Sequence, residues 1–475
     1  MAAGELLRPA FLETLGLVAG TSNLRTDPAD CWPYGYDNSR RHVPPEAVVF
    51  AISHAQVLGV VRLCNRHRVA LTARGRGTGT CGGSVPVQGG VVLSLERMDR
   101  ILEINPADRL MVIETGAANQ AVQDAAARHA FFWPPDPTSA AYCTVGGNLA
   151  FNSAGPRAVK YGTPRENTLG LRAVTGAGEE LRTGVRTSKG VVGLDLTRLL
   201  IGSEGMLAII TEATLKLTPL APCRRTLRAI YADVDAAARA VISIMAQPVI
   251  PCALEFMDDT ALDMIRVYSR ADLPEHAGAL LMIEVDGDED CIDFAADALA
   301  RAAKVDGLIR IERAHDETQV AALWATRKAL SPALRNVAPG KINEDVVVPV
   351  SRLAELVEGL RRLSLAHGVK IVNYGHAGNG NIHVNLLLDP QDPRQVRAAQ
   401  RCLDAVFSLV LRLGGTLSGE HGVGLSKRDF VARELDPVAL RLMRDIKRTF
   451  DPNGILNPGK GWPEENSPPG GKSSQ

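Results

Sequence analysis

Residues 73–83 read ARGRGTGTCGG, a loop with five glycines in eleven residues. It follows the apolar, β-branched run VALTARG at 69–75 and precedes a second such run, VVLSL at 91–95. Because glycine has no Cβ, the backbone N–H groups of such a loop are able to converge on an anion. The spacing fits neither the Rossmann fingerprint nor the P-loop, and the loop leads into a strand rather than a helix. A pyrophosphate is the natural ligand, and a plain turn between strands is the alternative.

Two further loops of small residues follow. PDPTSAAYCTVGGNLAFNSAG at 135–155 places hydroxyl groups between turns, and GSEGMLAIITEATLKLTP at 202–219 runs into an apolar strand. Three such loops in this order are hard to explain as unrelated turns. The runs VVFAIS (48–53) and LMVIETG (110–116) also predict strands, and HAQVLGVVRLCNRH (54–67) predicts a helix. We therefore expect one ligand-binding domain over residues 43–220.

The rest of the chain predicts a second α+β domain. A chain of 475 residues exceeds one ordinary core, so two or three domains are expected. After Pro219, strand and helix patterns alternate, with helices expected at 317–334 and 353–367, a strand at 345–350, and a hairpin around a glycine turn at 371–389. We expect a lead-in with a helix at 1–42, the first domain at 43–220, a substrate or cap domain at 221–425, a C-terminal helix and strap at 426–462, and a disordered tail at 463–475.

Composition excludes several classes of protein. Lysine plus arginine equals aspartate plus glutamate, at 53 each, so no basic excess favours a nucleic-acid partner. The eight cysteines form no C-x-x-C pair, and scattered single cysteines suit a reducing cytoplasm. The N-terminus lacks the pattern of a signal peptide, and no apolar stretch is long enough to span a membrane.

Histidines gather in two short motifs. His376 and His383 flank a glycine turn in GHAGNGNIH, and Glu420 and His421 stand side by side in SGEHGVG. In a hairpin both histidines are able to meet at one point. Two imidazoles and a carboxylate bind a divalent metal such as zinc or manganese and leave positions for substrate. A structural role for these histidines is the alternative.

The loops also resemble a known family. ARGRGTGTCGG, PDPTSAAYCTVGGNLAFNSAG, KYGTPRENTLGLRAVTGAGE (160–179) and LIGSEGMLAIITEATLKLTP (200–219) resemble the FAD domain of the vanillyl-alcohol oxidase, or PCMH-type, flavoproteins. YGHAGNGNIHVNL (374–386), SGEHGVGLSKR (418–428) and FDPNGILNPGK (450–460) resemble the branch that contains the FAD-binding chain of glycolate oxidase, FAD-linked D-lactate dehydrogenase and D-2-hydroxyglutarate dehydrogenase. The resemblance covers about residues 45–462. It implies an α+β fold with a two-subdomain PCMH-type FAD domain and a ferredoxin-like cap domain.

The resemblance implies which residues bind FAD. The first loop would hold the pyrophosphate, and the second would line the flavin and the ribityl chain. Glu204, Gly205 and Ile210 would flank the adenine or the flavin ring. Asn457 and Lys460 of the C-terminal strap would close the site. Thr78 and Thr80 occupy the region in which relatives with covalent FAD carry a histidine, so non-covalent binding is expected. The implied residues are Arg74, Gly75, Arg76, Gly77, Thr78, Gly79, Pro137, Thr138, Ser139, Gly146, Asn148, Ser153, Gly155, Glu204, Gly205, Ile210, Asn457 and Lys460, with Gly82 and Gly83 shaping the turn.

The resemblance also implies a mechanism. His376, His383 and Glu420 would carry the metal, Arg327 would bind the substrate carboxylate, and Asn385 would contact the substrate. His421 would take the hydroxyl proton as general base while the C2 hydride passes to N5 of FAD. Asn379 stands where relatives commonly have aspartate, which would remove a hydrogen-bond partner from the metal site.

The identity of the hydroxy acid rests on one position. Relatives acting on D-2-hydroxyglutarate carry a lysine two residues before the aspartate that corresponds to Asp345. Here that position is Asn343, and Lys341 is expected to be out of register. D-lactate is therefore favoured, ahead of glycolate and D-2-hydroxyglutarate.

Two other functions stay open at this stage. The chain could be an aldehyde- or alkyl-transfer flavoenzyme of the same superfamily, or a non-catalytic FAD-binding part of a larger complex. Electrons must leave to an external acceptor, which is a quinone, a cytochrome or an electron-transfer flavoprotein. A homodimer, and a cytoplasmic enzyme that is peripheral at the inner face of the membrane, are compatible with this assignment.

Overall fold

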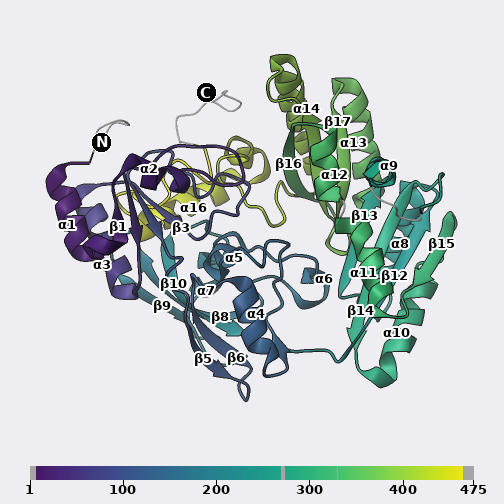
Figure 1. Cartoon of the computed structure of the whole chain (residues 1–475), viewed down its shortest axis with the longest axis horizontal. Coiled ribbons are helices and arrows are strands. Elements are labelled where there is room, and N and C mark those ends of the chain that lie inside the picture. The colour runs from purple at the N-terminus through teal and green to yellow at the C-terminus, as the bar shows by residue number, and fades with distance from the viewer. Residues whose placement is uncertain (1–6, 269–272, 329, 464–475) are drawn as a thin grey trace. The chain divides into compact units, whose positions relative to one another are not determined.

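The computed structural model describes residues 7–268, 273–328 and 330–463 (Figure 1). The chain divides into two compact units. The first unit comprises residues 1–154, 162–220 and 420–475, and the second comprises 155–161 and 221–419. The domain ranges expected from the sequence stay predictions, because compactness alone does not define a functional domain.

The first unit contains a small, mostly parallel sheet with the strand order β1-β2-β4-β3. Helices α1 (Pro9–Ala19) and α3 (His54–His67) pack on it and share one apolar core with its strands. Ser53 caps α3 by accepting a hydrogen bond from the backbone of Gln56. The glycine loop leaves this sheet at the end of β3. The strands are β1 (Leu24–Arg25), β2 (Ala47–Phe50), β3 (Leu71–Arg74) and β4 (Val91–Ser94).

A second sheet of the first unit is antiparallel, with the order β5-β6-β10-β8-β9. Its inner face forms a separate core with α4 (Asn119–Ala127), α5 (Val145–Phe151) and α7 (Leu196–Leu200). The last long helix, α16 (Pro437–Phe450), adds Ile446 and Phe450 to this core. The strands are β5 (Ile101–Asn105), β6 (Leu110–Glu114), β8 (Thr168–Thr175), β9 (Glu180–Gly184) and β10 (Ala208–Lys216).

The second unit is built on one seven-stranded antiparallel sheet, ordered β15-β12-β14-β13-β17-β18-β16. Its first half runs β12, α8, β13, α9, β14, α10, β15 along the chain and pairs in the order of a ferredoxin-like unit with α9 inserted. The pairing of β13 with β17 joins this half to the second. The strands are β12 (Cys223–Tyr231), β13 (Ala253–Asp258), β14 (Ala279–Gly287), β15 (Leu308–Arg313), β16 (Gly340–Val347), β17 (Lys370–His376) and β18 (Asn381–Leu388).

Helices cover both faces of this sheet. Apolar residues of α9, α11 and α12 form one core with Val372, Tyr374 and Leu387 of the strands. The helices α8, α10, α13 and α14 also contact the sheet but lie outside that core, so they cover the opposite face. Their bounds are α8 (Val234–Met245), α9 (Asp259–Tyr268), α10 (Glu289–Ala302), α11 (Glu317–Lys328), α12 (Leu330–Val337), α13 (Leu353–His367) and α14 (Pro393–Arg412).

Several element boundaries differ from the prediction. The helix expected at 317–334 is helical on both sides of residue 329, in α11 and α12, and residue 329 itself lies outside the described residues. The strand expected at 345–350 begins at Gly340 instead, because β16 pairs with β18 from Gly340 to Val347. The expected tail lies outside the described residues apart from Pro463.

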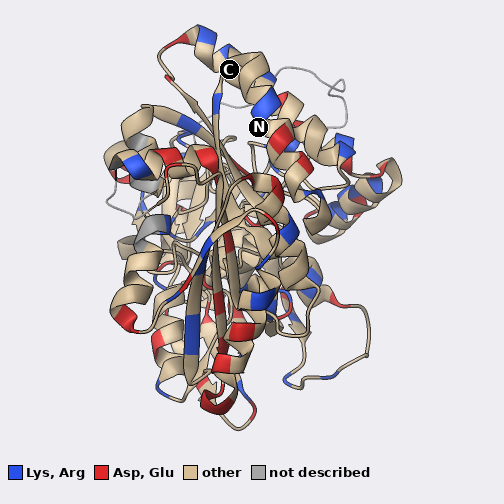
Figure 2. Cartoon of the chain, turned by 90° about the vertical axis from the view of Figure 1, so that its right-hand side faces the viewer, with Lys and Arg blue, Asp and Glu red and all other residues tan. Residues whose placement is uncertain are grey.

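The surface carries both signs of charge. Figure 2 shows acidic and basic residues interspersed along the same helices and strands. Among the described residues, no helix is long and apolar enough to cross a membrane.

Candidate functional site

The glycine loop presents backbone N–H groups, as an anion-binding loop requires. Within the described part of the chain, the N–H groups of residues 75–80 donate to no protein acceptor. The loop carbonyls are held instead, because the backbone N–H of Asn38 donates to Gly79 O at 2.9 Å and its side chain donates to Thr78 O at 3.1 Å. These residues therefore fit a pyrophosphate.

Two glycines of this loop are required by close packing. A Cβ at Gly75 would lie 2.3 Å from Thr144 Oγ1, and Gly77 has φ +66° with its Cβ position 2.2 Å from Arg74 Nη2. Arg74 is 7% exposed, and its guanidinium donates to Tyr36 O at 2.7 Å and to Ser84 Oγ at 3.3 Å. The side chain of Arg74 therefore stabilises the conformation of the loop by linking Tyr36 to Ser84.

The second loop is organised around the start of α5. Thr144 caps this helix by accepting from Gly147 N at 3.2 Å, and Gly146 N donates to Thr115 O at 2.7 Å. Asn148 is buried and accepts a hydrogen bond from Asn119 at 3.0 Å. Residues 137–143 form a turn in which Pro137 O and Ser139 O accept backbone hydrogen bonds, and Thr138 is exposed.

The C-terminal strap ties back to the first loop, at Gly83, and to the third loop, at Glu204. The Glu204 carboxylate accepts from the backbone N–H groups of Val423, at 2.6 Å, and Gly424, at 2.8 Å. Asn457 donates to Glu204 O at 2.6 Å, and Lys460 Nζ donates to Gly83 O at 2.9 Å. Burial raises the pKa of Glu204 and lowers the pKa of Lys460 to about 7. Glu204, Asn457 and Lys460 thus fix the loops whose N–H groups stay open.

The histidines lie in the second unit, on the sheet face that α9, α11 and α12 cover. In an antiparallel sheet, residues paired across strands and residues two apart on one strand share a face. His383 therefore shares its face with Tyr374 and Asp345, with which it is paired, and with Asn385, two residues further along β18. The rings of His376 and His383 are 5.2 Å apart between centroids and nearly perpendicular. Both side chains are buried.

Glu255 is the residue at this site that sequence reasoning missed. It lies on β13 opposite His376, is 2% exposed, and accepts from His376 Nδ1 at 2.5 Å and from Arg327 Nε at 3.1 Å. Burial raises the pKa of Glu255, but the neighbouring His376 and Arg327 lower it by more, so this pKa lies below its ordinary value. The Arg327 guanidinium also lies 4.5 Å from the centre of the Tyr374 ring. No motif marks Glu255, because it stands over a hundred residues before its partner His376.

Lys341 reaches the site from a neighbouring position of β16, although Asn343 holds the position two residues before Asp345. Lys341 and Asn343 are alternate residues of β16 and share a face, and Lys341 Nζ donates to Asn385 Oδ1 at 3.2 Å. The Asn385 amide also donates to Val372 O and His383 O, so this fully buried side chain is engaged at both ends. Asn379 is exposed in the turn between β17 and β18, so it does not support the histidines.

Glu420 and His421 open the last segment of the first unit. Glu420 O accepts from Ser153 Oγ at 2.8 Å, and a Cβ at Gly422 would lie 2.4 Å from the Phe151 ring. Gly419, the last residue of the second unit, donates its N–H to Asp345 Oδ2 at 2.9 Å. The structure thus brings Arg327, His376, His383 and Asn385 together in one unit and fixes the segment that follows Gly419 in the other.

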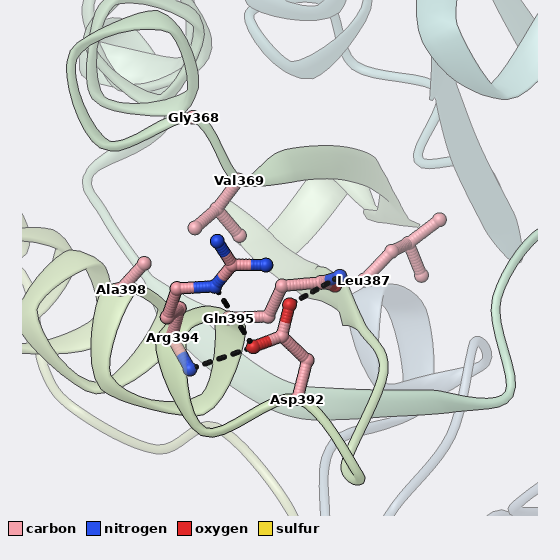
Figure 3. A pocket seen from close by; sticks show the side chains of 7 residues that line it. All are labelled: Gly368, Val369, Leu387, Asp392, Arg394, Gln395 and Ala398. Carbon is pink, nitrogen blue, oxygen red and sulfur yellow. Dashed lines mark hydrogen bonds and ion pairs between the residues drawn. The ribbon is translucent and has the colours of Figure 1, made fainter.

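A surface pocket of the second unit holds none of the predicted site residues (Figure 3). It lies between the end of α13 and the start of α14. Its two charged side chains pair with each other, since Arg394 Nε lies 3.5 Å from Asp392 Oδ1, and Asp392 also accepts from the backbone N–H of Arg394 at 2.8 Å. The pocket is lined by Gly368, Val369, Leu387, Asp392, Arg394, Gln395 and Ala398.

Comparison with known proteins assigns the family. Residues 45–184 match an FAD binding domain, and residues 221–461 match the C-terminal domain of FAD linked oxidases. The chain belongs to the FAD-linked oxidases. The FAD-linked oxidases are oxidoreductases, so the prediction of a flavoenzyme with FAD as cofactor is confirmed.

Curated relatives narrow the branch. The chain is 35% identical to the glycolate oxidase subunit GlcD of Bacillus subtilis, over 94% of this chain and 96% of the relative. It is 35% identical to a D-lactate dehydrogenase of Anaerostipes hadrus over 88% and 89%, and 34% identical to a D-2-hydroxyglutarate dehydrogenase of Xanthomonas citri over 94% and 95%. The prediction of an FAD-linked hydroxy-acid dehydrogenase is confirmed at this level.

The fold prediction is confirmed as well. A p-cresol methylhydroxylase structure with substrate bound superposes with a TM-score of 0.78 over 97% of each chain, at 19% identity. The α+β architecture of this FAD-linked oxidase is therefore PCMH-type, as the loops predicted.

Proposed function

We propose that the protein is an FAD-dependent D-2-hydroxyacid dehydrogenase that oxidises D-lactate to pyruvate. The observation that carries the proposal is the polar cluster on one face of the second unit's sheet, where Arg327, His376, His383 and Asn385 stand together. A carboxylate-binding arginine beside two buried imidazoles suits a small 2-hydroxy acid.

Arg327 is the proposed binder of the substrate carboxylate. Its Nε is occupied by Glu255, while Nη1 and Nη2 donate to no protein acceptor within the described residues. A guanidinium held in this way offers two parallel donors to a carboxylate.

His376 and His383 are proposed to hold a divalent metal with Glu420. With metal–nitrogen bonds of about 2 Å, two imidazoles on one ion have ring centroids roughly 5 Å apart, and the centroid distance here is 5.2 Å. Glu420 is tethered to the site by the chain, since its Cα lies about 3.8 Å from that of Gly419, which Asp345 holds. When bound, the metal supplies positive charge that lowers the pKa of the substrate hydroxyl. His421 is proposed as the base that takes the hydroxyl proton.

The proposed FAD is non-covalent, because Thr78 and Thr80 offer no imidazole for attachment. Its pyrophosphate would bind the N–H groups of residues 75–80. When bound, FAD supplies N5 as the acceptor of the C2 hydride. Residues 137–155, Glu204, Gly205, Ile210, Asn457 and Lys460 are proposed to complete its site.

The proposal includes an external electron acceptor, which is a quinone, a cytochrome or an electron-transfer flavoprotein. It includes a homodimer and a cytoplasmic enzyme that meets its acceptor in solution or at the inner face of the membrane. Glycolate oxidase and D-2-hydroxyglutarate dehydrogenase activities are the alternatives, and the position of Lys341 beside Asn385 favours the second of them.

A substrate panel with an artificial dye as acceptor tests the proposal. We expect D-lactate to give the highest kcat/KM among D-lactate, L-lactate, glycolate and D-2-hydroxyglutarate. Dye reduction by none of the four would contradict a hydroxy-acid dehydrogenase, and a clear preference for another acid would replace D-lactate as the substrate.

A further inference from the structure

A single buried carboxylate joins two parts of the second unit's polar cluster. Glu255 Oε1 accepts from His376 Nδ1 at 2.5 Å, and Glu255 Oε2 accepts from Arg327 Nε at 3.1 Å. Each oxygen thus holds one residue to which the proposed function gives a role. The carboxylate is 2% exposed, so water does not compete for these contacts.

The contact with His376 fixes the tautomer of its ring. A histidine that donates from Nδ1 to a carboxylate keeps the lone pair of Nε2 for another partner, and its ring is held in one orientation. Asn379, the position at which the sequence predicted the loss of a supporting partner, is exposed. Glu255, from a different strand, occupies the supporting place.

The contact with Arg327 limits where its guanidinium points. Glu255 holds Nε, and the Tyr374 ring lies 4.5 Å from the guanidinium carbon. One helical turn earlier, Trp324 Nε1 donates to the buried Glu284 at 2.8 Å, which anchors α11 on the sheet. The terminal nitrogens of Arg327 are therefore presented in one fixed direction.

We infer that Glu255 is the positioning residue of this site, aligning His376 for a divalent cation and Arg327 for the carboxylate of a hydroxy acid. The inference rests on the proposed function, because it assigns Glu255 a role in binding both ligands. A purely structural ion pair is the competing explanation, and it predicts loss of folding without a selective loss of either ligand.

Glu255→Gln in the full-length holoenzyme tests the inference, because it keeps the size of the side chain and removes its charge. We expect the affinity for zinc, measured by competition with a chelator, to fall 10- to 100-fold, the range found when a residue supporting a metal-bound histidine is replaced. We expect the dissociation constant of D-lactate, measured from flavin reduction in a stopped-flow instrument, to rise up to about tenfold. FAD content should stay near that of the unmodified protein.

Two further variants make the outcome decisive. Glu284→Gln removes the charge of another buried carboxylate of the same sheet, which touches neither His376 nor Arg327. The amide oxygen still offers an acceptor to Trp324 Nε1, so α11 stays anchored and the zinc affinity should be unchanged. Glu255→Asp keeps the charge but is too short to hold both His376 and Arg327, so its zinc affinity should be intermediate. This variant tests the inference even if Glu255→Gln does not fold.

Zinc and D-lactate affinities equal to those of the unmodified protein, in either folded Glu255 variant, would overturn the inference. Failure of the proposed function looks different. In that case the unmodified protein itself would bind no zinc, and no hydroxy acid would reduce its flavin.

Discussion

Lys341 Nζ lies 3.2 Å from Asn385 Oδ1, although the two residues belong to different strands and are not opposite each other in the register. The lysine is paired with Leu387, and its side chain extends along β16 towards Asn343, the partner of Asn385, to reach the asparagine. A cation thereby stands two residues along β18 from His383, on the same face.

Replacing this lysine distinguishes two substrate classes. If D-lactate is the substrate, Lys341 acts through Asn385, and Lys341→Met should lower kcat/KM for D-lactate and for D-2-hydroxyglutarate by a similar factor, about 3- to 10-fold. Steady-state kinetics with both acids measure this, and Lys370→Met, an exposed lysine of β17, is the control. A loss confined to D-2-hydroxyglutarate would mean that Lys341 binds a distal carboxylate.

The glycine loop is expected to fail as an FAD site once Gly77 carries a side chain. In Gly77→Val a branched Cβ would meet the Arg74 guanidinium and would have to adopt φ +66°. We expect largely FAD-free protein, measured by acid precipitation and flavin absorbance of the supernatant. Gly193→Ala is the control, because Gly193 has φ +79° with nothing within 4 Å of its Cβ position. A normal flavin content in Gly77→Val would show that this loop does not hold the FAD. Flavin that stays in the acid pellet of the unmodified protein would show that the FAD is covalently bound.

The stability of the protein should carry a pH dependence from Asp258. Burial raises the pKa of this carboxyl from 3.8 to about 7, despite hydrogen bonds from Ala261 N and from Asn373. The folded state therefore holds more protons than the unfolded chain between these values, so the contribution of Asp258 to the free energy of unfolding falls as the pH rises from about 4 to 7.

Asp258→Asn removes this contribution. The difference in the free energy of unfolding, variant minus unmodified protein, should increase between pH 5 and pH 8 in urea titrations. A difference that stays constant over this range would show that Asp258 does not change protonation there.

Metal ligation and proton transfer are expected to separate in two histidine variants. His383→Ala should lose metal and lower turnover by about a hundred- to a thousandfold, roughly 3–4 kcal/mol of transition-state stabilisation, while FAD stays bound. His421→Ala should be equally slow but should keep its metal. Elemental analysis beside kinetics measures both.

His315→Ala serves as the control for these two variants, because His315 is an exposed histidine outside the cluster. Chelation of the unmodified enzyme should abolish turnover, and a divalent cation should restore it. Full activity and full metal content in His383→Ala would mean that the histidine pair is structural.

The sequence predicted those elements that are defined by residues close together in the chain. The glycine loop, the hairpin of β17 and β18 and the helix α13 follow from residues close together in the chain, and these were predicted near their observed bounds. Strands β8 and β9 were not predicted. β9 reads ELRTG, with no fully buried residue, and it is defined by its pairing with β8.

The site shows the same division. His376, His383 and Asn385 stand in one motif and were found there, whereas Glu255 and Lys341 join them through strand pairing across 121 and 44 residues of sequence. Lys341 and Asn343 share a face because they are alternate residues of β16, but only the pairing of β16 with β18 brings Lys341 within reach of Asn385.

The central claim is that the bound flavin takes a hydride from a D-2-hydroxy acid, and anaerobic mixing tests it most directly. The yellow holoenzyme, mixed with D-lactate in the absence of oxygen and dye, should lose its visible flavin absorbance in a single turnover, and L-lactate should leave it unchanged. A flavin that stays oxidised with D-lactate, glycolate and D-2-hydroxyglutarate alike would contradict the account.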